Sequence, residues 1–575
     1  MKRLFVFALI IANVFCAFGG PGDGDSKPPA KRQRIDPDGY DIELWLREAD
    51  TDYEDDTDCE DDMVIAKGQG TKSLIEVVRS YGGTVTYLKP DGVELRIKGV
   101  CLGMEDIVLL LKENGDKENI RVLAWEGPRG MGDMFVRCFS EVLKSNKSLI
   151  RLSLECNYLR DDDLVVLSEA LRINDTLREL DLSKNSVGSK GVRALSEVLV
   201  ENDTLRELDL SENSVGSEGV EALSEALKVN RSLTILSLKD NKIGPDGGIK
   251  LAGALKINTS LEELDLSNNS VGSEGVEALS EALKVNGSLT ILVLKKNEIG
   301  PGCGAELSQA LKVNKALKKL DLSYNSIDDL TFDVLAVNAT LQVLDLFANE
   351  AVSGGFLGAL NVNTALISLN LRSCCSIGNE GAEKIGEALK VNRTLTNLDL
   401  LSNSIGDEGA EKIGEGLKVN TVLTDLNLGC NAIGKEGAEK IGEALKVNRT
   451  LTNLDLLSNS IGDEGAKKIG EALKVNTALT TLNLRYNAIG NEGAEKLSEV
   501  LKVNKALTTL EMWGNPIEDK GLNALWEALK ENETLIVLSL SLRKIGGEVR
   551  NALLEALKSN TTITDLGWLP PLDEP

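Results

Sequence analysis

The chain has 575 residues and a formal net charge of −26, from 64 Lys+Arg against 90 Asp+Glu, and only 4% of its residues are aromatic. A body this acidic repels phosphate backbones, which argues against broad nucleic-acid binding. The sequence contains no histidine, which removes Ser-His-Asp and Cys-His nucleophile pairs, His-ligated zinc and imidazole general bases. Composition therefore excludes most enzyme mechanisms, and we expect no catalytic residue, no cofactor and no metal.

Residues 1–19 have the layout of a secretory signal peptide. Lys2 and Arg3 precede a mostly apolar run from Leu4 to Phe18, and glycines follow. The run is shorter than the roughly 20 apolar residues that a membrane span needs. We therefore expect a secreted protein with no membrane span after signal cleavage. An uncleaved anchor is the alternative.

Residues 20–62 are predicted to be a disordered linker, basic at first and then acidic. Lys31, Arg32 and Arg34 follow Pro28-Pro29-Ala30 in an arrangement typical of a short nuclear-import signal. A chance basic patch is the alternative. Residues 36–62 carry fourteen acids against one base, Arg47. The basic cluster suggests an alternative location to secretion. The protein would then work in the nucleus or cytoplasm, and in a host cell if it is exported.

The chain repeats itself with a period of 28 residues from position 148 to position 561. In the unit 204–231, Leu205, Leu208 and Leu210 followed by Asn213 predict a short strand with alternately buried leucines and a turn. The apolar spacing of residues 220–227 predicts a helix. One unit buries too little apolar surface to be stable alone, so the strands must stack into one parallel sheet. A degenerate unit at 119–147 brings the total to about 16 repeats over 119–561.

Two details of the repeat lead to local predictions. Ser217 is expected to cap the start of the helix, and Asn230 is expected to stop it in a left-handed conformation. The units that start at 316 and 340 are shorter than 28 residues. Each is expected to lack about one helical turn.

The repeat consensus LxxLDLSxNxIGxEGAxxLxEALKxNxTL resembles the ribonuclease-inhibitor-type leucine-rich repeat, as in the repeat domains of NOD-like receptors. The resemblance covers about three quarters of the chain. The resemblance implies an α/β fold: a right-handed horseshoe with an inner parallel β-sheet, outer helices and a concave binding face. Residues 63–118 are then expected to form the N-terminal cap region, and residues 562–575 the C-terminal cap or tail.

Side chains beside the buried leucines of each strand are expected to point into the concavity, where they form a mostly acidic inner wall. These candidate partner-binding acids are Glu179, Asp181, Glu207, Asp209, Glu263, Asp265, Asp321, Asp345 and Glu511. A basic protein would be steered to such a wall, and solvated scaffolding is the alternative reading. Two pairs of aromatic side chains are the candidate anchors for a partner protein. Tyr324 and Phe347 are expected near Lys319 and Arg372, and Tyr486 and Trp513 are expected beside Arg485.

The sequence therefore predicts a non-catalytic protein-interaction scaffold that binds another protein on its concave face, and a basic protein is the kind of partner that the acidic wall favours. Export is expected, and an effector role inside another cell is a further hypothesis. The alternatives are an inhibitor that wraps a basic enzyme and a GTPase activator of the Ran type. Two features of the sequence point to different compartments. The cysteines form no CxxC pair, and thiols without a disulfide framework fit a cytosolic or nuclear protein. N-x-S/T sequons, which can be glycosylated in a secreted protein, recur at the expected helix stops, as at Asn174, Asn202, Asn230, Asn392 and Asn448. The oligomeric state is left open.

Overall fold

The computed structural model describes residues 84–88, 92–98, 120–126, 132–328, 333–349, 354–374, 377–541 and 546–566. The chain divides into two compact units, Met1–Lys72 and Ser73–Pro575, and every described residue belongs to the second. The predicted signal peptide, the linker and the import-like cluster lie outside the described residues. No helix among the described residues combines the length and the apolar character needed to cross a membrane.

All described strands join one 18-stranded sheet in which each strand pairs with its neighbours along the chain. The sheet begins with β1 (Thr84–Leu88), which pairs antiparallel with β2 (Gly92–Lys98), and β2 pairs parallel with β3 (Ile120–Glu126). The remaining strands have three residues each and pair in parallel: β4 (Arg151–Ser153), β5 (Glu179–Asp181), β6 (Glu207–Asp209), β7 (Ile235–Ser237), β8 (Glu263–Asp265), β9 (Ile291–Val293), β10 (Lys319–Asp321), β11 (Val343–Asp345), β12 (Ser368–Asn370), β13 (Asn397–Asp399), β14 (Asp425–Asn427), β15 (Asn453–Asp455), β16 (Thr481–Asn483), β17 (Thr509–Glu511) and β18 (Val537–Ser539).

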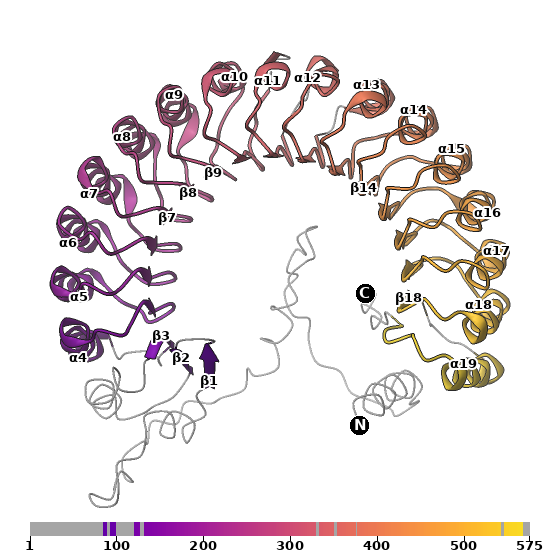
Figure 1. The fold of residues 1–575 in the computed structure, drawn as a ribbon, viewed down its shortest axis with the longest axis horizontal. Helices are drawn as coiled ribbons and strands as arrows, with labels where there is room; N and C mark the ends of the chain where they lie inside the picture. Colours follow the sequence, from indigo (N-terminus) through magenta and orange to yellow (C-terminus); the bar gives the residue numbers. More distant parts are fainter. Residues whose placement is uncertain are drawn as a thin grey trace, which may run out of the picture. The chain divides into compact units, whose positions relative to one another are not determined.

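One helix follows each strand from β3 to β18. The helices are α4 (Gly132–Ser145), α5 (Asp161–Ile173), α6 (Ser189–Leu199), α7 (Gly216–Val229), α8 (Pro245–Leu255), α9 (Gly272–Leu283), α10 (Cys303–Val313), α11 (Asp333–Val337), α12 (Gly354–Ala359), α13 (Gly378–Val391), α14 (Asp407–Leu417), α15 (Lys435–Leu445), α16 (Gly462–Leu473), α17 (Asn491–Leu501), α18 (Asp519–Glu531) and α19 (Gly547–Ser559). Within this unit the strands line the inner side of an arc and the helices its outer side (Figure 1). The predicted α/β horseshoe with an inner parallel sheet is therefore confirmed.

The core lies between the sheet and the helices. In each three-residue strand the middle leucine is buried and pairs with the middle leucine of the neighbouring strand, as Leu208 does with Leu236. Val220, Leu223 and Leu227 on α7 are at most 1% exposed, which confirms the predicted helical stripe. Because each repeat covers the apolar surface of the next, the core is continuous along the solenoid.

In most of the described repeats two asparagines, usually buried, hold the turns together. Asn213 donates from Nδ2 to the carbonyls of Leu182 and Leu210 at 2.9 and 3.0 Å, and its Oδ1 accepts from the Val187 N–H. At the helix stop, Asn230 donates to the Leu199 carbonyl at 2.7 Å. Each asparagine thus satisfies backbone groups of the preceding repeat, which replaces hydrogen bonds that three-residue strands cannot supply.

Both local cap predictions were wrong. Asn230 has extended backbone (φ −61°, ψ 136°), because its role is to reach the previous repeat and not to reverse the chain. Helix α7 already starts at Gly216, whose φ of +62° makes the bend, so Ser217 lies inside the helix. The Ser217 hydroxyl instead accepts from the Gly244 N–H, at the start of the next helix, at 3.1 Å.

The two short units have short helices, as predicted. Helices α11 and α12 have 5 and 6 residues, whereas the flanking α10 and α13 have 11 and 14. Strand pairing through this region is unchanged, with Leu320, Leu344 and Leu369 in register. The irregularity is therefore confined to the helical side.

Candidate protein-interaction face

The inner wall consists of the first and last residues of each strand, which flank the buried leucine. Glu179, Glu207 and Glu263 are first residues, and Asp181 and its counterparts in β6 and β8 are last residues. All are half-buried, because neighbouring strands crowd them on both sides. The predicted acids therefore do line one continuous surface, but the two positions have different environments.

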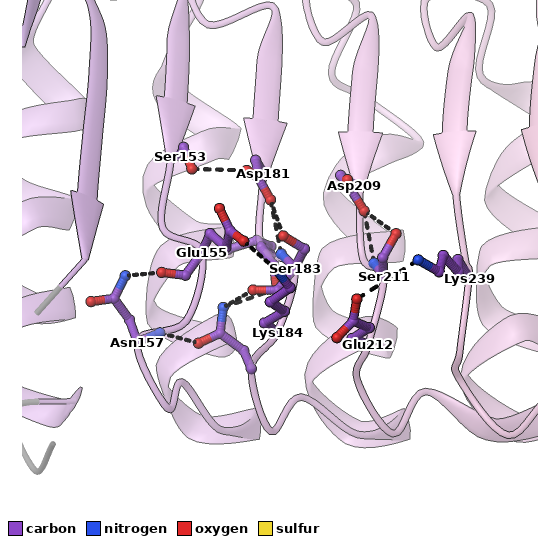
Figure 2. Close-up of polar contacts among 12 residues, drawn as sticks. Ser153, Glu155, Asn157, Asp181, Ser183, Lys184, Asp209, Ser211, Glu212 and Lys239 are labelled. Carbon is purple, nitrogen blue, oxygen red and sulfur yellow. Dashed lines mark hydrogen bonds and ion pairs between the residues drawn. The ribbon is translucent and has the colours of Figure 1, made fainter. Parts of the chain in front are cut away.

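The aspartates at the strand ends are tied into the turns that follow them. Asp181 accepts hydrogen bonds from the Ser183 N–H at 2.9 Å, from the Ser183 hydroxyl at 2.7 Å and from the Ser153 hydroxyl of the previous repeat at 2.8 Å (Figure 2). Asp321 and Asp345 likewise accept from the backbone N–H two residues further on. These carboxylates stabilise turns, and a partner would meet oxygens that are already hydrogen-bonded.

In the second half of the chain, aspartate and asparagine alternate at the strand ends. Asn370, Asn427 and Asn483 each donate from Nδ2 to the aspartate of the preceding repeat, at 3.0, 3.2 and 2.9 Å. We call this series the Asp/Asn ladder; its acidic members are Asp345, Asp399 and Asp455. Burial raises the pKa of all three carboxyls, even though each also accepts a backbone N–H. Asp399 and Asp455 are 56 residues apart, as are Asn427 and Asn483, so this part of the ladder recurs every two repeats.

The glutamates that begin β5, β6 and β8 are the part of the wall that keeps its acidic character. Glu179 lies 3.3 Å from Arg151. Burial raises the pKa of Glu207, and the charges of Glu179 and Glu263 raise it further. Mutual repulsion among these carboxylates would be relieved by a cation, so this segment favours a basic surface.

The second and third residues after each strand form a row along the edge of the inner wall, which we call the rim. Rim charges in the N-terminal repeats pair across neighbouring units. Lys184 lies 2.8 Å from Glu155, and Lys239 lies 3.9 Å from Glu212 (Figure 2). The third position has a left-handed backbone in repeat after repeat, with φ of 54° at both Lys184 and Tyr324. The repeat's turn imposes this conformation, so it is not a mark of function.

Four rim residues from consecutive repeats stack on one another in the middle of the solenoid. The rings of Tyr324 and Phe347 meet edge to face with centroids 4.5 Å apart. The Lys295 ammonium lies 4.8 Å from the Tyr324 centroid, and the Arg372 guanidinium lies 4.8 Å from the Phe347 centroid. We call Lys295, Tyr324, Phe347 and Arg372 the central rim cluster. Both rings are half-buried, which leaves an exposed surface between two cations.

A second cluster lies in the C-terminal repeats. Tyr486 and Trp513 meet edge to face at 4.9 Å, and Arg485 lies 5.7 Å from the Trp513 centroid and 3.4 Å from Glu511. The Tyr486 ring packs on Gly514, where an added Cβ would lie 2.5 Å from the ring. Tyr486 is nevertheless 45% exposed. We call Arg485, Tyr486 and Trp513 the C-terminal rim cluster.

The structure brings most of the predicted anchors together, with two differences. Lys319 lies on β10, exposed, and takes no part in the aromatic stack. Lys295 completes the stack but was not predicted. The sequence could have indicated Lys295 as a member of the stack, because Lys295, Phe347 and Arg372 occupy the same position of successive or near-successive repeats. The contact was missed because the sequence does not show that Tyr324 reaches back one repeat.

Two cysteines and the sequon asparagines lie in the connections between strands and helices. Cys156 and Cys430 have φ of 60° and 50° and lie in the turns that follow β4 and β14, ten repeats apart. Cys101 and the side chain of Cys138 lie outside the described residues. The sequon asparagines at the helix stops are largely buried: Asn174, Asn230 and Asn448 are 3–4% exposed, and each donates to a leucine carbonyl 31 residues earlier.

We therefore predict that the folded protein carries no N-glycan at these helix stops, even when it is secreted by a glycosylating cell. A glycan needs the same Nδ2 that donates to the previous repeat. Asn268, a rim residue in the sequon Asn268-Asn269-Ser270, is half-buried and outside this bond series, so it is the expected exception. Glycopeptide mass spectrometry of monomeric secreted protein would check this. A glycan at Asn230 in natively folded material would contradict it.

Comparison with known proteins agrees with this geometry. The family described as "Leucine Rich repeat" matches ten segments: residues 174–196, 201–224, 229–252, 258–280, 313–330, 362–386, 391–414, 419–442, 447–470 and 475–498. No curated protein matches the chain.

Similar solved structures include an internalin from Listeria monocytogenes (20% identity, 67% of this chain and 86% of that chain, TM-score 0.37), the leiomodin-1 actin-binding site 2 (23%, 24% and 80%, TM-score 0.22) and the mouse RP105/MD-1 complex (18%, 78% and 62%, TM-score 0.44). Because ten matched segments fall in register with the observed strand–helix units, the chain belongs to the leucine-rich-repeat family.

Proposed function

We propose that this leucine-rich-repeat protein is a non-catalytic scaffold that binds another protein on its concave face and rim. The observation that carries the proposal is the gathering of scarce aromatic residues into two rim clusters, each with an arginine beside the rings. Aromatic and arginine side chains dominate the energetics of protein interfaces. Neither pair is needed to close the core, since the leucines beneath are fully buried.

Site-specific photo-crosslinking of the full chain tests this proposal. A benzophenone amino acid at Phe347 or Trp513 is expected to yield a discrete protein adduct, and one at Lys384, exposed on the helical side, is expected to yield none. Against the captured protein, the double variant Phe347→Ala/Trp513→Ala should raise Kd by at least about 10-fold. Equal adducts from Lys384 and the rim, or no adduct from either rim position, would overturn the proposal.

A second candidate, an inhibitor that wraps a basic enzyme, is favoured by the row Glu179, Glu207 and Glu263. Like charges held together on the inner wall would gain from a cationic surface. Binding of this kind should weaken steeply between 50 and 300 mM salt, on the scale set by the Debye length. The activator of a Ran-type GTPase gains no comparable support, because Arg372 and Arg485 both lie against aromatic rings.

Export and an effector role remain part of the proposal on sequence grounds alone. The apolar run of residues 4–18 supports secretion, and the Lys31, Arg32 and Arg34 cluster supports a nuclear or cytoplasmic working place in a host cell. Mass spectrometry of protein from cells and from medium would report the N-terminus. An unchanged distribution of Lys31→Ala/Arg32→Ala/Arg34→Ala would overturn the import role.

A further inference from the structure

A row of apolar side chains lies along the rim between β13 and β17. Its members are Leu401, Leu457 and Trp513, at the second position after β13, β15 and β17, and we call them the Leu/Trp row. All three are half-buried, so part of each side chain remains exposed. The fold does not require an apolar residue at this position, because it is serine or lysine in the repeats from β5 to β10: Ser183, Ser211, Lys239, Ser267, Lys295 and Ser323.

The members of the row have a regular spacing of two repeats. Backbone hydrogen bonds continue the strand pairing into the rim: the Ser402 N–H donates to the Gly429 carbonyl at 2.9 Å, and the Cys430 N–H donates to the Leu457 carbonyl at 2.6 Å. The corresponding bonds recur as far as β17. Rim residues therefore keep the strand spacing of about 4.8 Å, and successive members of the row lie roughly 9.6 Å apart.

The residues between the members leave the apolar side chains accessible. Gly429 lies between Leu401 and Leu457 and has no side chain; a Cβ added there would lie 3.4 Å from Leu401 Cδ1. Arg485 lies between Leu457 and Trp513, but its guanidinium is 5.7 Å from the centroid of the Trp513 ring and 3.4 Å from Glu511. A partner can therefore contact both leucines without a larger side chain between them.

The Asp/Asn ladder runs beside the row and carries negative charge that its hydrogen-bond donors do not neutralise. Asp455, two residues before Leu457, accepts from two neutral groups, the Leu457 N–H at 2.7 Å and Asn483 Nδ2 at 2.9 Å. Burial raises the pKa of Asp455, and the charges of Glu511 and Asp399 raise it further. A cation brought beside the row would relieve this repulsion.

We infer that the Leu/Trp row binds a basic amphipathic helix of the partner protein, in which apolar residues recur every seven positions. This inference rests on the proposed function and specifies the chemistry of the partner. Seven residues of an α-helix rise about 10.5 Å, close to the roughly 9.6 Å between members of the row. The whole row spans four strand spacings, roughly 19 Å, which about 13 helical residues match. Cationic residues three or four positions from the apolar ones would face the ladder.

Two other backbone conformations fit the row less well. Side chains on one face of a β-strand recur about every 6.6–6.8 Å, which is too short for the spacing of the row. A polyproline II helix has a turn of about 9.3 Å, but its backbone carbonyls need hydrogen-bond donors. The Gly429 N–H, between the two leucines, already donates to Asn427 at 2.9 Å. The spacing and the charge together therefore favour the α-helix.

A synthetic peptide tests the inference without knowledge of the natural partner. The probe has three heptads with leucine at the first and fourth positions and lysine at the fifth and seventh. Fluorescence polarisation with the full chain is expected to show binding at least about 10-fold tighter than that of a peptide of the same composition with its leucines at alternate positions. Replacement of the lysines by glutamate should weaken binding by a similar factor.

Two double variants locate the site. Leu401→Ser/Leu457→Ser introduces the serine that other repeats carry at this position and should weaken binding at least about 10-fold. The matched control is Val419→Ser/Val475→Ser, which removes valines that are 52% and 54% exposed after the helices of the same two repeats, and it should leave binding unchanged. Neither variant changes charge, so the general attraction of a basic peptide to a chain of net charge −26 is the same in both.

Three outcomes would overturn the inference. One is equal binding of the heptad peptide to the wild type and to Leu401→Ser/Leu457→Ser. Another is an equal loss in Val419→Ser/Val475→Ser. The third is equally tight binding of the alternate-position peptide or of a proline-rich peptide of matched charge. The crosslinking at Trp513 separates the two proposals: an adduct that forms while the heptad peptide shows no preference for the wild type keeps the scaffold function and rejects the helix.

Discussion

Replacement of Asn487 by alanine is expected to lower the free energy of unfolding by about 1–3 kcal/mol. Asn487 is 0% exposed; its Nδ2 donates to the Leu456 carbonyl at 2.7 Å and to the Arg485 carbonyl at 3.0 Å. Each carbonyl keeps one other donor, Asn459 Nδ2 for Leu456 and the Ser458 N–H for Arg485, so the cost is that of two lost buried hydrogen bonds, about 1 kcal/mol each. It also removes the acceptor of the Ile461 N–H. Urea-induced unfolding followed by circular dichroism measures the effect.

A matched control is Thr477→Ala. Thr477 is exposed and lies beside the helix stop that precedes Asn487. This substitution should change the free energy of unfolding by less than about 0.5 kcal/mol. A loss below about 1 kcal/mol for Asn487→Ala would mean that water replaces the side chain. The turn asparagines would then not hold adjacent repeats together.

The sequence was sufficient to predict the fold because its leucines recur at a spacing that only a stacked sheet can bury. Leu208, Leu236 and Leu264 lie in register for that reason, and no tertiary detail was needed. The same alternation placed Phe347 and Arg372 on one surface. It could not predict what Asp181 does, since a period of two fixes the direction of a side chain but not the turn that folds back to donate to it.

The rest of the site depends on contacts between repeats. Ser217 was predicted to serve its own helix but accepts from the next one, at Gly244. Tyr324 was predicted beside Lys319, but its ring lies under Lys295 of the preceding repeat. Such contacts depend on how far one turn leans over another, a quantity that strand stacking sets and that no single repeat encodes.

Deletion of two whole repeats is expected to destabilise the protein less than deletion of one repeat. This is the reverse of the order that chain length predicts. Removal of residues 422–477 joins Thr421 to Ala478 and recreates the native sequence Asn-Thr-Ala-Leu at the junction. It also places Asn483 beside Asp399, so the Asp/Asn ladder is kept. Removal of residues 422–449 alone places Asp455 beside Asp399 and removes Asn427, the donor between them. The longer product thus contains two adjacent half-buried carboxylates.

At pH 7 the single-repeat deletion should be less stable than the double deletion by about 1–3 kcal/mol, although it retains 28 more residues. Burial already raises the pKa of Asp399 and Asp455, and adjacency raises both further. A carboxyl whose folded pKa exceeds its unfolded value binds more protons when folded, so the stability it contributes is present at acidic pH and is lost as pH rises through the folded pKa.

The difference between the two deletions should therefore shrink as the pH falls from 7 towards about 4, the ordinary pKa of an aspartate. Parallel denaturant titrations at several pH values measure it. In the native chain Asp181 and Asp209 are also neighbours, but serine hydroxyls donate to both, from Ser183 and Ser211. Leu401 and Leu457 take those positions at the new junction, so no hydroxyl can compensate. If stability instead simply increased with repeat number at every pH, repeat stacking alone would determine it and the ladder would be energetically neutral.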